Sequence, residues 1–145
     1  MWLYSIVTYA HFISVFILFS ALIVELSIIK EEMTENNFII LKKANVLIGI
    51  FSGLTIATGL LRMYYFGKGP NYYLSNPLFI VKLSLFAITG LLSIYPTIQF
   101  NKSKNLETKI TKLEHFKAVQ LILKVELVLF LVIPLLAVFV AKGIV

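Results

Sequence analysis

Four long apolar stretches constrain what this chain can fold into. They cover approximately residues 2–29, 38–66, 77–100 and 117–141, and few ionisable side chains interrupt them. A helix rises 1.5 Å per residue, so about 20 apolar residues cross the ~30 Å hydrocarbon core of a bilayer. Each stretch is long enough to do so. The sequence therefore predicts an all-α integral membrane protein, a bundle of four transmembrane helices that run antiparallel, up and down.

Composition excludes most other classes of protein. Hydrophobic residues make up 59% of the 145 residues, and the four stretches leave no room for a separate soluble catalytic domain, so we expect one membrane domain over 1–145. Cysteine is absent, which excludes disulfides, thiolate metal sites and cysteine nucleophiles. The net charge of +6 comes largely from lysines in the short connections. These lysines are typical of topology determinants, and the expected partner is the lipid bilayer rather than nucleic acid.

The distribution of lysine between the connections predicts an orientation. Positive residues are more frequent in connections 30–37 and 101–116 and at the adjoining helix ends than on the opposite side. The positive-inside rule therefore places these two connections in the cytoplasm, with both termini and the 67–76 loop outside. Within the second cytoplasmic connection, apolar residues at helical spacing favour a short interfacial helix before the fourth span: Leu106, Ile110, Leu113 and Phe116.

Each span carries ionisable residues, whose placement in the membrane costs free energy and must be compensated. A charge at the centre of a membrane helix costs roughly 2.5–3.5 kcal/mol on insertion scales. Polar residues recur at steps of three, four or seven along the spans, so they share one stripe per helix that we expect to face the bundle interior. Depth counted along the helices places His11, Arg62 and Lys82 in the outer half, with Glu126 beneath them.

These four residues are the candidate site, and each also has a purely structural interpretation. His11 could form a hydrogen bond to a neighbouring helix, or act as a ligand or proton relay. Arg62 could extend outward to lipid headgroups, and Lys82 could form a structural ion pair with Glu126. Glu25 and Lys124 are expected to reach the inner surface or to pair there rather than to do chemistry.

Histidine usage limits the cofactors that the site could hold. The other histidine, His115, lies in the second cytoplasmic connection and out of reach of His11. A haem with two histidine ligands within one subunit is thereby excluded, as is a histidine-rich metal site. The sequence is still compatible with a haem that has His11 as its single histidine ligand. Arg62 and Lys82 would be suited to bind the propionates of that haem.

Several strings in the chain resemble a known family. They are YAHFISVFILFSALIVEL, TGLLRMYYFGKGPNYYLSNPLFIVKLSLF, GLLSIYPTIQF and LKVELVLFLVIPLLAVFVAKGIV, and together they cover nearly the whole chain. The chain is similar to a bacterial family of four-helix inner-membrane proteins known only as a domain of unknown function. The resemblance implies a bacterial cytoplasmic membrane and four spans, and it implies no activity.

A weaker resemblance concerns small four-helix membrane proteins associated with haem or copper. The layout is similar to that of the HemJ-type protoporphyrinogen oxidases and the CopD-like copper-resistance proteins. The HemJ type has a histidine in its first helix, a Trp-x-x-x-Lys-Leu segment in its third and an Asn-Glu-x-Pro segment in its fourth. Here His11, Lys82-Leu83 and Glu126 fall at the corresponding places. The tryptophan is replaced by Leu78 or Phe79, and Lys124-Val125-Glu126-Leu127 replaces the last segment. The resemblance implies a shared site position rather than a shared substrate.

Three functional classes remain open at this stage. The first is a haem- or porphyrin-binding redox protein with haem b as the candidate cofactor. His11 would then be the one histidine able to act as an axial ligand of the iron. The second is a small proton-coupled transporter or channel that uses the polar stripe, and the third is a structural or assembly protein. Whether the protein is an enzyme stays open, although the absence of aspartate disfavours a hydrolytic triad. Four helices make a thin bundle, which favours a homodimer.

Overall fold

The computed structural model describes residues 1–103 and 110–144. In that part of the chain, four long helices account for most residues and short elements connect them. The elements in order are α1 (Trp2–Ile28), β1 (Glu32–Thr34), α2 (Glu35–Leu61), the π-helical turn η1 (Arg62–Phe66), α3 (Pro70–Leu74), α4 (Pro77–Lys102), β2 (Ile110–Lys112) and α5 (Phe116–Ala141). The prediction of an all-α bundle of four spans is confirmed.

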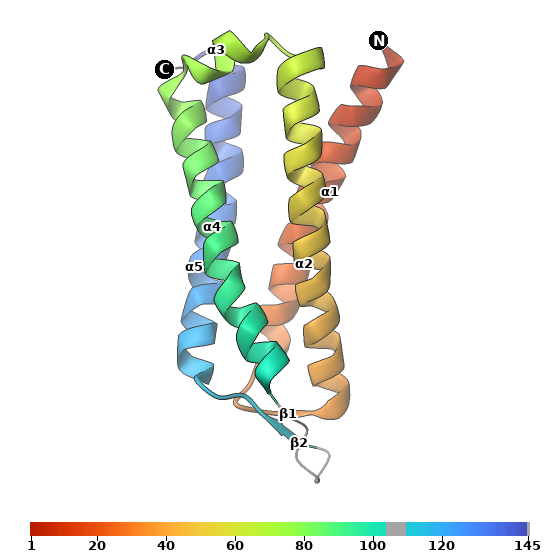
Figure 1. The fold of residues 1–145 in the computed structure, drawn as a ribbon, viewed down its shortest axis with the longest axis vertical. Coiled ribbons are helices and arrows are strands. Elements are labelled where there is room, and N and C mark those ends of the chain that lie inside the picture. Colours follow the sequence, from red (N-terminus) through yellow and green to blue (C-terminus); the bar gives the residue numbers. More distant parts are fainter. Residues whose placement is uncertain (104–109, 145) are drawn as a thin grey trace.

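The four long helices form two antiparallel hairpins (Figure 1). α1 packs along α2, α4 packs along α5, and the hairpins meet through α1 and α5, with little contact between α2 and α4. Both termini and α3 lie at one end, which we call the outer end, and β1 and β2 lie at the other, inner end. All four helices are long and apolar enough to cross a membrane. Large apolar side chains remain exposed along each of them, as expected for helices in contact with lipid.

Local sequence signals explain where the helices begin. The Thr34 side chain accepts a hydrogen bond from the Asn37 backbone N–H and caps α2. The Asn76 side chain caps α4 by accepting from the backbone N–H groups of Leu78 and Phe79, and Pro77 occupies the first helical position. α2 continues into η1, so that Arg62 begins a wider turn at the outer end of the span.

The inner end is closed by a short antiparallel ladder rather than by a helix. β1 pairs with β2, with Met33 opposite Thr111 and both side chains buried. The predicted interfacial helix is therefore wrong for the described residues 110–112, because pairing with β1 buries Thr111 between two exposed neighbours in the two-residue period of a strand. Phe116 begins α5. Leu106 lies outside the described residues, as do Lys104 and Lys109, two of the lysines that predict a cytoplasmic second connection.

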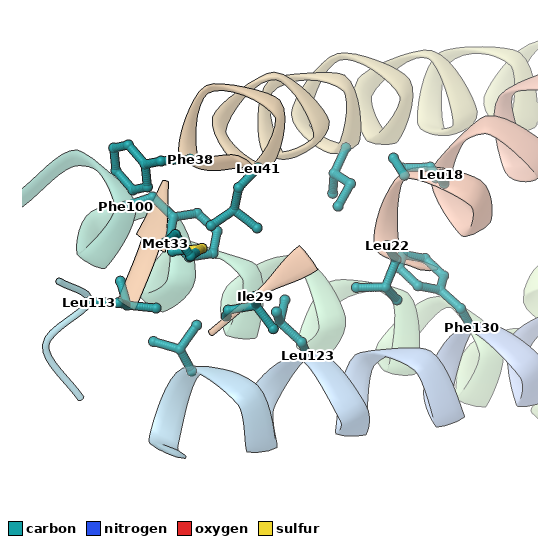
Figure 2. Packing of buried hydrophobic residues seen from close by; sticks show 13 residues of the cluster. Leu18, Leu22, Ile29, Met33, Phe38, Leu41, Phe100, Leu113, Leu123 and Phe130 are labelled. Atoms are coloured by element: carbon teal, nitrogen blue, oxygen red, sulfur yellow. The ribbon is translucent and has the colours of Figure 1, made fainter. Parts of the chain in front are cut away.

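The buried apolar core occupies the inner half of the bundle, where the two hairpins converge. Figure 2 shows how its side chains interlock between α1, α2, α4 and α5 and above the ladder. The largest fully buried members include Leu18, Leu22, Leu41, Phe100, Leu113 and Leu123. No member of this cluster precedes Leu18 on α1 or follows Ile48 on α2, so the outer half of the described bundle is less tightly filled. The candidate residues of that half sit above this core.

Candidate functional site

His11 is fixed against α2 in one tautomer. Its Nδ1 lies 2.9 Å from the Thr58 hydroxyl oxygen, and that hydroxyl in turn lies 2.7 Å from the Leu54 carbonyl oxygen. A threonine hydroxyl has one proton, and the Leu54 carbonyl can only accept it. Thr58 therefore accepts from His11 Nδ1–H, and the lone pair of the neutral ring lies on Nε2. The Thr55 backbone also contacts the ring, and the hydrogen bond to the Thr58 side chain is made by Nδ1 rather than by Nε2.

The His11 ring lies against Gly59 of α2. A Cβ atom at Gly59 would lie 3.4 Å from His11 Cε1, which is van der Waals contact, so an alanine at this position would touch the ring without displacing it. The imidazole thus packs beside Gly59, and Thr58 accepts its proton. The interpretation of His11 as a residue bonded to a neighbouring helix is thus correct, and it is compatible with a ligand role because the Thr58 bond uses Nδ1 and not Nε2.

Two cations share the outer end with His11. The positive charges of Arg62 and Lys82 both act on the imidazole, which places the three groups in one neighbourhood. Arg62 is half-buried, its guanidinium lies 5.7 Å from the centroid of the Phe12 ring, and its buried Nε has no hydrogen-bond partner. The Lys82 ammonium lies 4.7 Å from the Phe79 ring centroid. Both cations therefore lie over aromatic rings. We call His11, Arg62 and Lys82 the basic cluster.

Glu126 does not belong to the basic cluster. Its Oε1 lies 2.9 Å from the Ser93 hydroxyl oxygen, with which it shares a hydrogen bond. Ser93 follows Lys82 by eleven residues on α4, which is roughly 16 Å along the helix axis. The hypothesis of a Lys82–Glu126 ion pair is therefore wrong, because Lys82 lies too close to the outer end to reach Glu126.

Glu126 instead belongs to a polar layer to which every long helix contributes. The Asn45 side-chain amide on α2 and the Thr97 hydroxyl on α4 lie 2.9 Å apart in a hydrogen bond, and the same hydroxyl lies 2.8 Å from the Ser93 carbonyl oxygen one turn before it. Glu25 on α1 completes this layer, because it interacts electrostatically with Glu126 and with the Asn45 side chain. We call Glu25, Asn45, Ser93, Thr97 and Glu126 the carboxyl layer.

The burial of Glu25 corrects the sequence interpretation. Glu25 was expected to reach the inner surface, yet its side chain is 0% exposed and neither carboxyl oxygen has a hydrogen-bond partner among the described residues. Position along the helix suggested an interfacial residue, whereas the ladder and its apolar neighbours extend the protein interior beyond that level. Its place on the polar stripe of α1 was the signal that indicated an interior residue. Lys124, by contrast, is exposed as expected.

The donor types at these places limit which metals could bind. Within residues 1–103 and 110–144, no three His, Cys, Asp or Glu side chains gather in a way that could hold a metal ion. A site built only of protein ligands for zinc or a similar ion is therefore not present in that part of the chain. A metal that brings its own macrocyclic ligands is not restricted in this way, since it needs only one axial group from the protein.

The fold and the buried polar groups define a multi-pass α-helical membrane protein with ionisable residues inside its bundle. Residues 3–145 match the family described as Predicted membrane protein (DUF2214), and the chain belongs to this family. No curated protein and no solved structure matches the chain.

Proposed function

We propose that this protein binds a haem or a related porphyrin, with haem b as the candidate, at the basic cluster of the outer half of the bundle and acts as a redox protein. The observation that carries this proposal is the tautomer of His11. A histidine that ligates a metal through one ring nitrogen almost always donates its other N–H to an oxygen of the protein. His11 does this through the Thr58 hydroxyl, which leaves Nε2 free to act as an axial ligand.

The charges beside His11 suit the acidic groups of such a ligand. Arg62 and Lys82 contact aromatic rings, and the Arg62 Nε has no hydrogen-bond partner among the described residues. Two cations at membrane depth are costly unless an anion joins them. The two propionates of a haem would supply that anion, with Arg62 able to donate two parallel hydrogen bonds to one carboxylate. When bound, the haem would supply one-electron chemistry, while the protein supplies the ligand and the counter-charges.

The same proposal includes a location and an orientation. The chain would lie in the bacterial cytoplasmic membrane with the outer end, which holds both termini and α3, facing away from the cytoplasm. The lysine bias predicts this orientation, and the fold is compatible with it, because β1, β2 and the described ends of both lysine-rich connections lie at the inner end. The basic cluster would then lie in the half of the membrane that faces the periplasm.

An absorption spectrum tests the proposal directly. The purified protein, titrated with haem in detergent, should show a Soret band with a saturating one-to-one stoichiometry. The band should be lost or strongly shifted in His11→Ala and should be restored by added imidazole. His115→Ala is the matched control and should bind as the unchanged protein does. A spectrum that is the same with and without His11, or no binding at all, would contradict the proposal. A colourless protein that carries protons across liposomes would favour the transporter interpretation instead.

Thr58 is the positioning residue of this site. Thr58→Val keeps the shape of the side chain and removes the oxygen that accepts from His11 Nδ1, so the ring loses its preferred tautomer. We expect the Soret maximum and the haem midpoint potential to shift in Thr58→Val and to return in Thr58→Ser. If Thr58 had only a structural role, Thr58→Val would change the stability of the protein and leave the Soret maximum and the midpoint potential of the haem unaltered.

A further inference from the structure

The carboxyl layer raises a question that haem binding at the outer end does not answer. Glu25 and Glu126 are 0% and 1% exposed, and they interact with each other across the interface between α1 and α5. Among the described residues, Glu126 shares one hydrogen bond with Ser93, and neither Glu25 oxygen has a partner within hydrogen-bond distance. Two ionised carboxylates in one apolar interior would repel each other and would each lose their hydration.

Apolar side chains seal this layer on both sides. Toward the outer end, Leu18 and Leu22 of α1 and Phe130 of α5 are all buried. Toward the inner end lie further members of the core cluster, which include residues of β1 and of the segment after β2: Ile29, Met33, Phe38, Phe100, Leu113 and Val119. Figure 2 shows several of these residues packed around the helices that carry the layer. Bulk water is therefore not the group that solvates the two carboxyls.

Among the described residues, no lysine or arginine on the helices packed against the layer lies within it. α1 contributes Glu25 alone, and α2 contributes Asn45, while Lys42 and Lys43 on the same helix are exposed. Lys42 lies over the Phe38 ring, with Nζ 5.8 Å from its centroid. α4 contributes two hydroxyls and the half-buried Tyr95, and α5 contributes Glu126, whose neighbour Lys124 is exposed. A buried acid without a cationic partner needs another way to lose its charge.

The hydrogen bonds around Ser93 indicate where a proton resides. The Ser93 hydroxyl oxygen lies 3.0 Å from the Thr89 carbonyl oxygen and 2.9 Å from Glu126 Oε1, but it has one proton to donate. If Glu126 is ionised, one of these two contacts brings acceptors together without a hydrogen. If Glu126 carries a proton, its O–H donates to Ser93 and Ser93 donates to Thr89, so both contacts become hydrogen bonds. The geometry favours the second arrangement.

We propose that the carboxyl layer is an intramembrane proton-binding site, in which Glu126 donates to Ser93 and Glu25 is the second acid that takes up a proton. A proton is the ligand that fits, since it needs only one acceptor oxygen. A bound Na⁺ or K⁺ would need several oxygens that converge on one point, and both Glu25 oxygens lack polar contacts of hydrogen-bond length among the described residues. The site lies in a different layer from the basic cluster and does not depend on haem.

An apolar carbodiimide tests this proposal on the unaltered protein. The reagent reacts with a protonated carboxyl in an apolar setting: the acid proton goes to nitrogen, the acid oxygen bonds to the central carbon, and rearrangement leaves a stable acylurea. Mass spectrometry after labelling at neutral pH should find the adduct at Glu126 or Glu25. The exposed Glu31, Glu32 and Glu35 are internal controls that should stay unlabelled. Labelling should fall steadily as the pH is raised.

Two further measurements keep the result decisive. Infrared difference spectra of unaltered protein against Glu25→Gln and Glu126→Gln should show the loss of a carboxylic acid C=O band in each variant, which the Gln isosteres allow without creating a cavity. The infrared band does not depend on entry of the reagent, so it reports the protonated carboxyl even where labelling fails. Absence of both the adduct and the band overturns the proposal. Protection of labelling by Na⁺ and not by K⁺ would overturn it as well, in favour of a sodium site.

Discussion

Ser93 is the single side chain through which α4 holds the buried carboxyl of α5. Its hydroxyl donates or accepts at 2.9 Å from Glu126, which is 1% exposed. Ser93→Ala removes this partner and leaves the Glu126 side chain buried without one, so we expect a loss of about 1–2 kcal/mol in the free energy of unfolding. A denaturant titration in micelles measures it. Ser84→Ala, on an exposed position of the same helix, is the control and should change stability by much less.

Lys82 and Glu126 should behave as independent residues. They lie roughly 16 Å apart along the bundle axis, judged from the Ser93 contact of Glu126, and distant sites usually add within about 0.3–0.5 kcal/mol. The effects of Lys82→Met and Glu126→Gln on thermal stability should therefore sum in the double variant. A double variant more stable than that sum would show that the two charges meet.

Proton linkage gives a prediction for the whole carboxyl layer. If the native state holds a proton on Glu126 or Glu25 that the unfolded chain releases in neutral solution, raising the pH must destabilise the native state. We expect the melting temperature to fall from pH 6 toward pH 9, and this slope to flatten in the Glu25→Gln, Glu126→Gln double variant. Glu31→Gln, at an exposed position, should leave the slope unchanged. Equal slopes in all variants would contradict this prediction.

The polar stripes predicted which residues face the bundle interior better than they predicted the hydrogen-bond partners of those residues. Spacing along each span placed His11, Arg62, Lys82 and Glu126 on interior faces, and all four are half-buried or buried in the structure. Spacing could not say which helices pack together, so it could not pair His11 with Thr58 or Glu126 with Ser93. A helical pattern fixes the face of a residue, whereas its partner depends on the rotation and vertical offset of the neighbouring helix.

At the scale of elements, Asn76 ties the start of α4 to the end of the chain. Its Oδ1 caps the helix, and its Nδ2 donates to the Ile144 carbonyl at 3.2 Å. Asn76→Ala removes both functions and should cost about 1 kcal/mol or more. Asn76→Asp keeps the capping oxygen and loses only the donor, so its loss should be smaller. Circular dichroism melts of the two variants measure this order, with the exposed Asn71→Ala as a control; equal losses would contradict it.

The two-stranded ladder should contribute to stability through its buried side. Met33 is 2% exposed and belongs to the core cluster, whereas its neighbour Glu32 points to solvent. Met33→Ala leaves a cavity in the core and should cost about 2–5 kcal/mol, and Glu32→Ala should cost little. Thermal melts of both variants check this prediction. Similar small losses in both would mean that the ladder covers the core without packing against it.

The ladder is also the element that the sequence did not reveal. Ile110 and Leu113 are three residues apart, so a helical period and a strand leading into a turn both fit so short a segment. The segment forms a strand rather than a helix because it pairs with β1, and three α-helices separate β1 from β2 in the chain. Local spacing carries no information about such a long-range pairing. The four spans, in contrast, were predicted to within a few residues because length and hydrophobicity determine them locally.

At the scale of the whole molecule, the arrangement predicts which lysines face the same compartment. Lys68 is exposed at the end that holds both termini, and Lys112 and Lys117 are exposed at the opposite end. A membrane-impermeant amine reagent added to intact cells should label Lys68 and spare Lys112 and Lys117. All three should react after the membrane is made permeable. Labelling of Lys112 or Lys117 in intact cells would show that the orientation is inverted.

The pairing of β1 with β2 also sets an order on how the protein is made. Met33 leaves the ribosome roughly 80 residues before Thr111, its partner across the ladder. β1 therefore stays unpaired while α2, α3 and α4 are synthesised. The ladder can form only once residues 110–112 have been made, when three of the four long helices are complete and α5 is still to be added. A chain released before residue 110 would thus lack both the ladder and α5, and nothing would join the inner ends of its helices across the bundle.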